Sequence, residues 1–447
     1  MSIWQIIARS DVPQVKFAEK HLAAAVREYS GRNADFGEES NGANHIFMQT
    51  DDTLPADSFS VKICAPQNGV QNIYILGADA SSLMYGCMDF VNLYLPQAAL
   101  THHNSNYFKK LFSDEPFDEI SYMKTPAIKH RGLWTWGLAV YDYRGYLENM
   151  ASLKLNEVIF WNDYPPVNGK EIVEYAHSLG IKVIWGYAWG WDTTMKLDDS
   201  EEAAARIADE YEKGYALLGG DGIYFQSFTE TSEETLNGRL IAEAVVDFVN
   251  RISGRILNKH PGLLLQFGLH ANSVKNRMNY IAGVDPRVHI IWENCGDFPY
   301  HYIPGVVSGR EETEDMTRRI LALRPGTTTG AVIKGMINLN WHEFSHQTGP
   351  EMLGCAQAET LEKRLHEARP IWRFFQAEWI KHGDSCRRVI DIFASQESEL
   401  YGLIEDGAFE KEIPLPAALF SEMLWDSRRP FDDILYEASI RRDVHFS

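Results

Sequence analysis

Between residues 128 and 341 the chain alternates short apolar runs with amphipathic stretches, and this alternation constrains the fold more than any other feature. Short apolar runs bounded by turn residues predict strands, whereas apolar residues spaced three and four apart predict helices. Repeated strand and helix pairs form a parallel sheet with right-handed crossovers. The predicted strands lie at residues 128–134, 157–161, 181–187, within 219–231, and at 262–268, 288–293 and 330–339. This series predicts a (β/α)8 barrel of the TIM type, although the sequence offers no clear eighth strand.

Two further parts flank the predicted barrel. The first hundred residues carry four strand candidates and two helix candidates, without a glycine-rich phosphate-binding fingerprint. Residues 97–127 have no clear period and contain two prolines, so a linker is expected there. The last ninety residues show amphipathic helix patterns rich in Trp, Arg and Glu. We therefore expect an α/β protein with a small N-terminal α/β sandwich domain at residues 1–121, the barrel at 122–356, and a helical C-terminal extension packed on the barrel at 357–447.

Charge and cysteine usage restrict the partners. The chain has 42 basic and 62 acidic residues, a formal charge of −20, which repels phosphate backbones and anionic membrane surfaces. We therefore expect no nucleic-acid partner and no membrane partner, and the sequence leaves homo-oligomerisation open. The five cysteines are scattered singly, without metal-binding spacing, which fits a reducing compartment. No signal-peptide pattern opens the chain, so a cytoplasmic location is predicted.

Two predicted strands end in glutamates. The stretch GGDGIYFQSFTET at 219–231 leads to Glu230, and RVHIIWENCGD at 287–297 contains Glu293. The carboxyl ends of barrel strands collect on one face, where active sites are built. Glycoside cleavage needs one carboxyl group as acid and a second group as base or nucleophile. We predict that Glu230 is the general acid, kept protonated by desolvation against nearby aromatic side chains, and that Glu293 is the base or nucleophile. A glutamate after a strand can instead cap a helix or form a loop ion pair.

Aromatic and polar side chains gather at the same strand ends. Eight of the twelve tryptophans lie in or just after predicted barrel strands, namely Trp134, Trp136, Trp161, Trp185, Trp189, Trp191, Trp292 and Trp341. Large aromatic side chains can fill a barrel, but flat apolar faces edged by polar groups also suit a pyranose ring. The predicted substrate-binding set is Trp134, Trp136, Asn162, Asp163, Tyr187, Trp189, Trp191, Gln226, Thr229, His270, Trp292, Asn294, Asp297, Lys334, Asn338 and Trp341. Asp163 and Asp297 are substitutes for the catalytic carboxylates, and Lys334 can bind a substrate carboxylate.

A zinc-like motif is present but lies in an unfavourable context. Residues 342–346 read HEFSH, which has the spacing of the HExxH motif. That motif needs a continuous helix, whereas this one follows a predicted strand end and precedes Gly349 and Pro350. We therefore expect no metal and no cofactor, and a metal-dependent hydrolase is the less favoured alternative.

The order of these parts resembles a known group of enzymes. A small α/β module with a late helix reading SSLMYGCMDFVNLYLP, followed by a barrel opening HRGLWTWG, resembles the glycoside hydrolases grouped around the family 67 α-glucuronidases and the β-hexosaminidases. The resemblance covers residues 1–350 and implies a glycosidase acting on an oligosaccharide, with an α-glucuronoside as one candidate. It places the family acid at Glu230 and the base at Glu293. Hexosaminidases use an adjacent Asp-Glu pair where this chain has Thr229 and Glu230, which argues against substrate-assisted hydrolysis. A barrel that binds carbohydrate without catalysis is the alternative.

Overall fold

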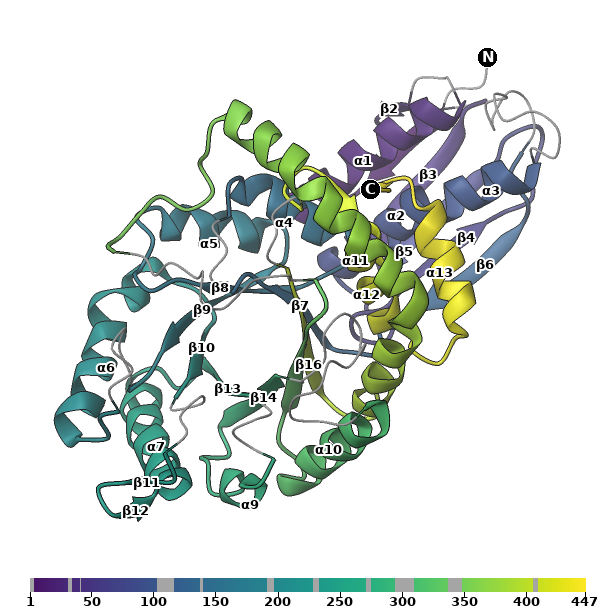
Figure 1. Ribbon diagram of the computed structural model, residues 1–447. Coiled ribbons are helices and arrows are strands. Elements are labelled where there is room, and N and C mark those ends of the chain that lie inside the picture. Colours follow the sequence, from purple (N-terminus) through teal and green to yellow (C-terminus); the bar gives the residue numbers. More distant parts are fainter. Residues whose placement is uncertain are drawn as a thin grey trace.

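The chain forms an N-terminal sheet domain and a closed eight-stranded barrel, which lie side by side (Figure 1). This confirms the predicted fold class. The computed structural model describes residues 4–30, 34–40, 42–102, 116–136, 140–190, 197–227, 233–270, 275–293, 309–336, 348–404 and 409–447.

The N-terminal domain is built on a six-stranded sheet of order β2-β1-β3-β5-β4-β6. The first four strands of this order run parallel, whereas β4 pairs antiparallel with both β5 and β6. Strand β6 lies in the predicted linker and extends the domain past residue 121. The elements are β1 (Trp4–Ala8), α1 (Pro13–Ser30), β2 (Ala34–Phe36), β3 (Asn44–Thr50), β4 (Phe59–Ile63), β5 (Asn72–Gly77), α2 (Ala80–Asp89), the π-helical turn η1 (Phe90–Tyr94), α3 (Leu95–His102) and β6 (Ile120–Lys124).

The barrel has the strand order β7-β8-β9-β10-β13-β14-β15-β16, and β16 closes onto β7. All eight strand pairs are parallel, and each of the seven predicted strands is present. The first elements are β7 (His130–Trp134), α4 (Tyr143–Ser152), β8 (Glu157–Trp161), α5 (Gly169–Ser178), β9 (Lys182–Ala188), α6 (Glu201–Lys213), η2 (Tyr215–Leu218) and β10 (Gly222–Gln226). A short hairpin, α7 and the remaining strands and helices follow as β11 (Thr235–Leu236), β12 (Arg239–Leu240), α7 (Ile241–Lys259), β13 (Leu264–His270), α9 (Met278–Ile281), β14 (Val288–Glu293), α10 (Arg310–Leu323) and β15 (Thr329–Ile333).

The eighth strand lies inside the range expected to be a helical extension. The 36-residue helix α11 (Ala358–Phe393) connects β15 to β16 (Ser398–Leu403), and α12 (Leu415–Trp425) follows β16. The division at residue 356 is therefore corrected, because residues 357–425 also supply the last strand and the last two helices of the barrel. Helix α12 is mostly apolar and buried along its whole length, as expected for a helix enclosed by other elements. The chain ends with α13 (Phe431–Ile440) and a small two-stranded sheet of β17 (Ile413–Pro414) and β18 (Val444–His445).

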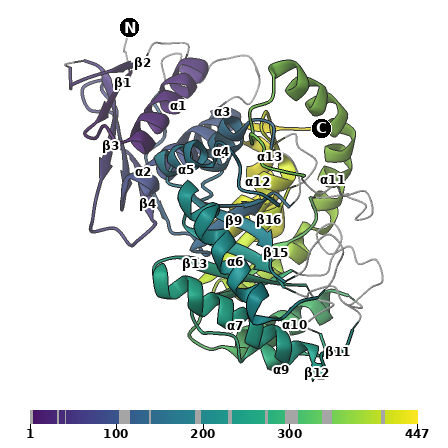
Figure 2. The same cartoon turned by 90° about the vertical axis from the view of Figure 1, so that its left-hand side faces the viewer.

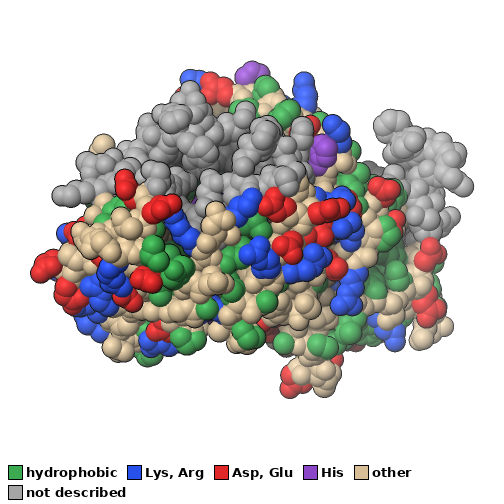
Figure 3. Space-filling model, turned by 60° about the horizontal axis from the view of Figure 1, so that its bottom comes forward, with side chains coloured by type: hydrophobic (Ala, Val, Ile, Leu, Met, Phe, Trp, Pro, Cys, Tyr) green, Lys and Arg blue, Asp and Glu red, His purple; other side chains and the backbone are tan. Residues whose placement is uncertain are grey.

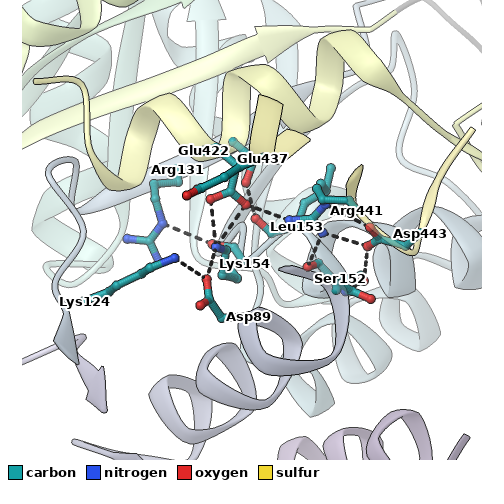
Figure 4. Close-up of polar contacts among 12 residues, drawn as sticks. Asp89, Lys124, Arg131, Ser152, Leu153, Lys154, Glu422, Glu437, Arg441 and Asp443 are labelled. Carbon is teal, nitrogen blue, oxygen red and sulfur yellow. Dashed lines mark hydrogen bonds and ion pairs between the residues drawn. The ribbon is translucent and has the colours of Figure 1, made fainter. Parts of the chain in front are cut away.

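A buried ion network joins the two domains and the C-terminal helices (Figure 4). Lys154, in the turn after α4, has its Nζ 3.0 Å from Asp89 Oδ1 of α2 and 3.0 Å from Glu422 Oε1 of α12. Lys124 of β6 also contacts Asp89, and Arg441 after α13 contacts Glu422. Burial alone would raise the pKa of Asp89, but the charges of the two lysines hold it well below its usual value. Figures 1 and 2 accordingly show the N-terminal domain on one side of the barrel, close to α12 and α13.

Among the described helices, none is both long and apolar enough to cross a bilayer. Acidic and basic side chains are interspersed over the face shown in Figure 3, so the net negative charge is not gathered into one patch there. The four cysteines within the described ranges, Cys64, Cys87, Cys355 and Cys386, form no disulfide.

Candidate active site

The lumen of the barrel is identified by one separate cluster of buried side chains. Its members come from seven strands spaced around the closed barrel, so they can meet only inside it. Because successive strand residues point to opposite faces, this cluster fixes which residues of each strand face the lumen. The cluster consists of Trp134, Ile159, Trp161, Ile184, Tyr224, Ile291, Val332, Tyr401 and Leu403.

Glu293 is the next lumen position after Ile291 and ends β14 at the mouth of the barrel. Its Oε1 accepts hydrogen bonds from the Tyr224 hydroxyl at 2.9 Å and from the Gln226 side-chain amide. Its Oε2 lies 3.7 Å from Lys334 Nζ. Burial and the carboxylate of Glu293 raise the pKa of Tyr224 well above its usual value, so this phenol remains a donor. Two hydrogen-bond donors therefore face one oxygen of Glu293, and an ammonium group lies near the other.

His270 and Lys334 lie beside Glu293 on the neighbouring strands. His270 ends β13 and stands opposite Glu293 in the strand register, while Lys334 follows directly after β15. Burial, together with the charge of Lys334, lowers the pKa of His270 to about 3. The imidazole is therefore neutral near pH 7 and offers one donor and one acceptor nitrogen. The predicted residues Gln226, His270, Glu293 and Lys334 thus gather on one side of the mouth.

An aromatic wall lies on the other side of the mouth. The ring centroids of Trp134 and Trp136 are 5.3 Å apart, and Trp161 lies 6.0 Å from the first and 5.5 Å from the second. These residues belong to β7, β8 and the segment after β7, and in the barrel order β7 and β8 stand opposite β13 and β14. Within the described residues, the indole Nε1 of Trp134 has no hydrogen-bond partner. The mouth therefore combines flat apolar surface with facing polar groups.

A second polar cluster fills the opposite end of the lumen, at the amino ends of the strands. His130 Nδ1 lies 2.5 Å from Glu157 Oε1, and the Tyr401 hydroxyl donates to Glu157 Oε2 at 2.6 Å. Burial would raise the pKa of Glu157, but His130 and Lys182 outweigh it and lower that pKa to about 2. His130, Glu157 and Glu399 are close enough together to hold a metal ion. Because protein donors already engage both oxygens of Glu157, we interpret this floor cluster as a stabilising network.

Three predicted binding residues point away from the lumen. Tyr187, Trp189 and Trp292 occupy the alternate positions that face the surrounding helices, and at most 2% of each is exposed. Trp189 stacks on Phe225 with 3.6 Å between ring centroids, and Tyr187 stacks on Tyr215 at 4.4 Å. The structure therefore places these three side chains in the layer between strands and helices. The sequence pattern grouped these three residues with the lumen residues because all of them lie near strand ends. Position near a strand end does not show which face of the strand a side chain is on.

The remaining predicted residues lie in loops. Asn162 and Asp163 follow β8; Asn162 is buried, and its backbone carbonyl accepts a hydrogen bond from the Tyr215 hydroxyl. Asp163 is partly exposed. Outside the described residues lie Trp191, Thr229, Glu230, Asn294, Asp297, Asn338, Trp341 and the HEFSH motif at 342–346. The pairing of Glu230 with Glu293 accordingly stays a prediction.

Tyr224 is a site residue that the sequence reasoning did not select. It lies in the lumen below Gln226, with its ring centroid 5.0 Å from Trp134 and 6.2 Å from Trp161. The available signal was the strand alternation, since Tyr224 and Gln226 are two positions apart and share a face.

Comparison with solved structures relates this arrangement to carbohydrate-active enzymes. The chain is similar to a GH138 enzyme targeting pectin rhamnogalacturonan II, with a TM-score of 0.55 and 10% identity over 96% of this chain and 64% of that one. It is also similar to the GH20 exo-β-N-acetylglucosaminidase of Vibrio harveyi, with a TM-score of 0.54 and 10% identity over 97% of this chain and 72% of that one. A GH115 4-O-methyl-α-glucuronidase with specificity for decorated arabinogalactans gives 0.53 and 13%, over 95% and 56%.

The fold is shared with glycoside hydrolases of several families. At these identities the likeness shows the fold alone, and a shared barrel does not by itself carry an activity. The chain spans less than two thirds of the GH138 and GH115 enzymes. Comparison of the sequence with protein-family models and with curated proteins gives no match.

Proposed function

We propose that the protein is a glycoside hydrolase in which Glu293 acts as the ionised carboxylate. The observation that carries this proposal is the surrounding of Glu293, where Tyr224 and Gln226 donate to one oxygen and the Lys334 ammonium lies near the other. A base or a nucleophile acts as the carboxylate, and hydrogen-bond donors with a nearby cation are suitable neighbours for that group. The position at the carboxyl end of a barrel strand is where such groups act.

The second carboxyl group in this proposal is Glu230. It follows β10 in the sequence, and β10 ends at Gln226, whose side chain contacts Glu293. Glu230 would protonate the leaving oxygen while Glu293 either attacks the anomeric carbon or removes a proton from water. A carboxyl separation of about 5 Å would give retention of configuration, and roughly 6.5 to 9.5 Å would give inversion.

The mouth suits a pyranose ring bound between an aromatic side and a polar side. Trp136, partly exposed beside the buried Trp134 and Trp161, can offer a flat face to the C–H groups of the sugar. His270 and the polar side can bond its hydroxyls. Lys334, whose side chain is 12% exposed, stands where a sugar carboxylate can approach. We therefore propose a uronic acid residue, such as an α-glucuronoside in an oligosaccharide, as the preferred substrate. The GH115 neighbour named as an α-glucuronidase agrees with this choice.

Glu293→Gln is the direct test, because it keeps the shape of the side chain and removes its charge. Turnover of aryl glycosides, with an α-glucuronide and an N-acetyl-β-glucosaminide in the panel, should fall by about 10²- to 10⁴-fold while calorimetry still detects sugar binding. Glu399→Gln is the matched control, since Glu399 is a buried lumen carboxylate at the other end of the barrel. It should lower stability and leave the catalytic rate of the folded enzyme close to that of the wild type.

The outcomes separate the two candidate functions. Wild-type turnover in Glu293→Gln would remove Glu293 from the mechanism. Sugar binding by the wild type without product on any glycoside would instead favour a barrel that binds carbohydrate and does not cleave it. A cytoplasmic location stays a prediction from the sequence, to be checked by cell fractionation. Homo-oligomerisation stays open and can be measured by light scattering.

A further inference from the structure

A glycine on the lumen face of β13 makes room for the contact between Tyr224 and Glu293. Gly268 lies on the strand between β10, which carries Tyr224, and β14, which carries Glu293. A Cβ atom at Gly268 would lie 2.2 Å from the Tyr224 hydroxyl oxygen, far inside van der Waals contact. Any other residue at this position would therefore occupy the place where the tyrosine reaches across β13 to the carboxylate.

The floor of the barrel repeats this arrangement with different strands. Gly132 lies on β7, between β16 and β8, and a Cβ atom there would lie 2.5 Å from Tyr401 Cδ1. The Tyr401 hydroxyl crosses β7 and donates to Glu157 at 2.6 Å. Each end of the lumen thus holds a tyrosine, a glycine and a glutamate on three successive strands, and only the set at the mouth contains the proposed catalytic carboxylate.

We propose that Tyr224 is a positioning residue for Glu293, and that Gly268 is the glycine that permits it. The proposal rests on the proposed function, in which Glu293 reacts in its ionised form. The groups that face Glu293 in the described part of the chain are Tyr224 and Gln226 from β10, His270 from β13 and Lys334 after β15.

Tyr224 is suited to orient the carboxylate because its own position is fixed. It is fully buried, and its ring lies against Trp134 and Trp161. Rotation of the ring away from Glu293 would require these indoles to move. The Lys334 ammonium, at 3.7 Å, is beyond hydrogen-bond distance and favours the negative charge without fixing the direction of the oxygen. The directional contacts therefore come from Tyr224 and Gln226.

Tyr224→Phe tests the proposal, since it keeps the ring and removes the donor. Loss of a hydrogen bond to the charged form should move the acidic limb of the profile of kcat/KM against pH upward by about one pH unit. Gly268→Ala should move the limb in the same direction, because its methyl group displaces the hydroxyl. An acidic limb at the wild-type pH in Tyr224→Phe would overturn the proposal.

Tyr401→Phe is the matched control, because it removes the equivalent hydrogen bond at the floor. It should lower the melting temperature and leave the acidic limb in place, since Glu157 is at the far end of the lumen. An equal shift of the limb in Tyr401→Phe and Tyr224→Phe would show that general loosening of the barrel, rather than positioning of Glu293, sets the profile.

A second readout does not depend on turnover. Infrared difference spectra, titrated with pH and compared with Glu293→Gln to assign the band, follow protonation of the Glu293 carboxyl group directly. The midpoint should move upward in Tyr224→Phe. A shifted midpoint in a protein that cleaves no glycoside would keep the positioning role and overturn the proposed function. An unshifted midpoint with intact turnover would overturn the positioning role alone.

Discussion

Lys154→Met should lower the free energy of unfolding by about 3 kcal/mol, the lower end of the range for breaking a buried ion pair. At 3.0 Å and an effective dielectric constant of 20, Coulomb's law gives about 5.5 kcal/mol for each of its contacts with Asp89 and Glu422. Desolvation of the buried ammonium offsets much of this sum. Each acid also keeps another cation, since Lys124 lies 2.9 Å from Asp89 and Arg441 lies 2.6 Å from Glu422. Because these cations remain after the substitution, we expect a loss at the lower end of the range for a broken buried ion pair.

Guanidinium unfolding, followed by tryptophan fluorescence and circular dichroism, measures the loss. The control is Lys213→Met, because Lys213 pairs with Asp209 on the surface of α6 and should change stability by less than about 0.5 kcal/mol. Adding Glu422→Gln to Lys154→Met removes the unbalanced charge and should recover part of the loss, which a double-mutant cycle reports as coupling. A loss in Lys154→Met no larger than that in Lys213→Met would refute the idea that the buried network holds the domains together (Figure 4).

Two further predictions concern the floor cluster and the aromatic wall. Burial lowers the pKa of His130, but Glu157 outweighs it and raises that pKa, so the pair stabilises fully below about pH 6.5 and this contribution is lost as the pH rises through the raised value. His130→Gln should therefore show a smaller fall in unfolding free energy from neutral to alkaline pH, and an equal fall would contradict the assignment. Trp136→Ala should weaken sugar binding about five-fold in calorimetry. The control is Trp185→Ala, on the outer face of β9, which should cost about 3 to 5 kcal/mol of stability and leave the dissociation constant for the sugar unchanged. Equal sugar binding by the wild type and Trp136→Ala would exclude the aromatic wall from the site.

The fold was predictable from the sequence wherever the outer face of a strand is apolar. Strands β8 and β14 have the predicted bounds, because apolar residues between turn signals define them. Strand β16 reads SELYGL and carries Glu399 and Tyr401 toward the lumen, so its pattern resembles neither a buried strand nor a surface strand. The long helix α11 also separates it from β15. The eighth strand was therefore not recognised in the sequence, because its lumen face is polar and the long helix α11 precedes it.

The sequence pattern led to the location of the candidate site more directly than to its members. Glu293 and Lys334 were selected because parallel strand ends converge, a property of topology that the sequence pattern carries. Trp292 was selected by the same rule, although it is adjacent to Glu293 and thus faces the other way. Distinguishing the two faces requires the register of the whole barrel, because both faces of a parallel barrel strand can be apolar. Tyr224 was missed for a related reason. Its contact with Glu293 depends on Gly268 in the neighbouring strand β13, which leaves room for the tyrosine.

The glycines on the lumen face show how the lumen below the candidate site is filled. Three of them leave a gap that an aromatic side chain from a neighbouring strand fills, and the pairs are Gly132 with Tyr401, Gly186 with Trp161, and Gly268 with Tyr224. Buried aromatic rings therefore pack in the middle of the lumen. A ligand that enters from the carboxyl ends of the strands would meet these rings at the bottom of the mouth. Glu293, His270 and Lys334 would lie along one side of the ligand. In the proposed function, this packing sets the depth at which a substrate binds, and the carboxylate of Glu293 lies at that depth.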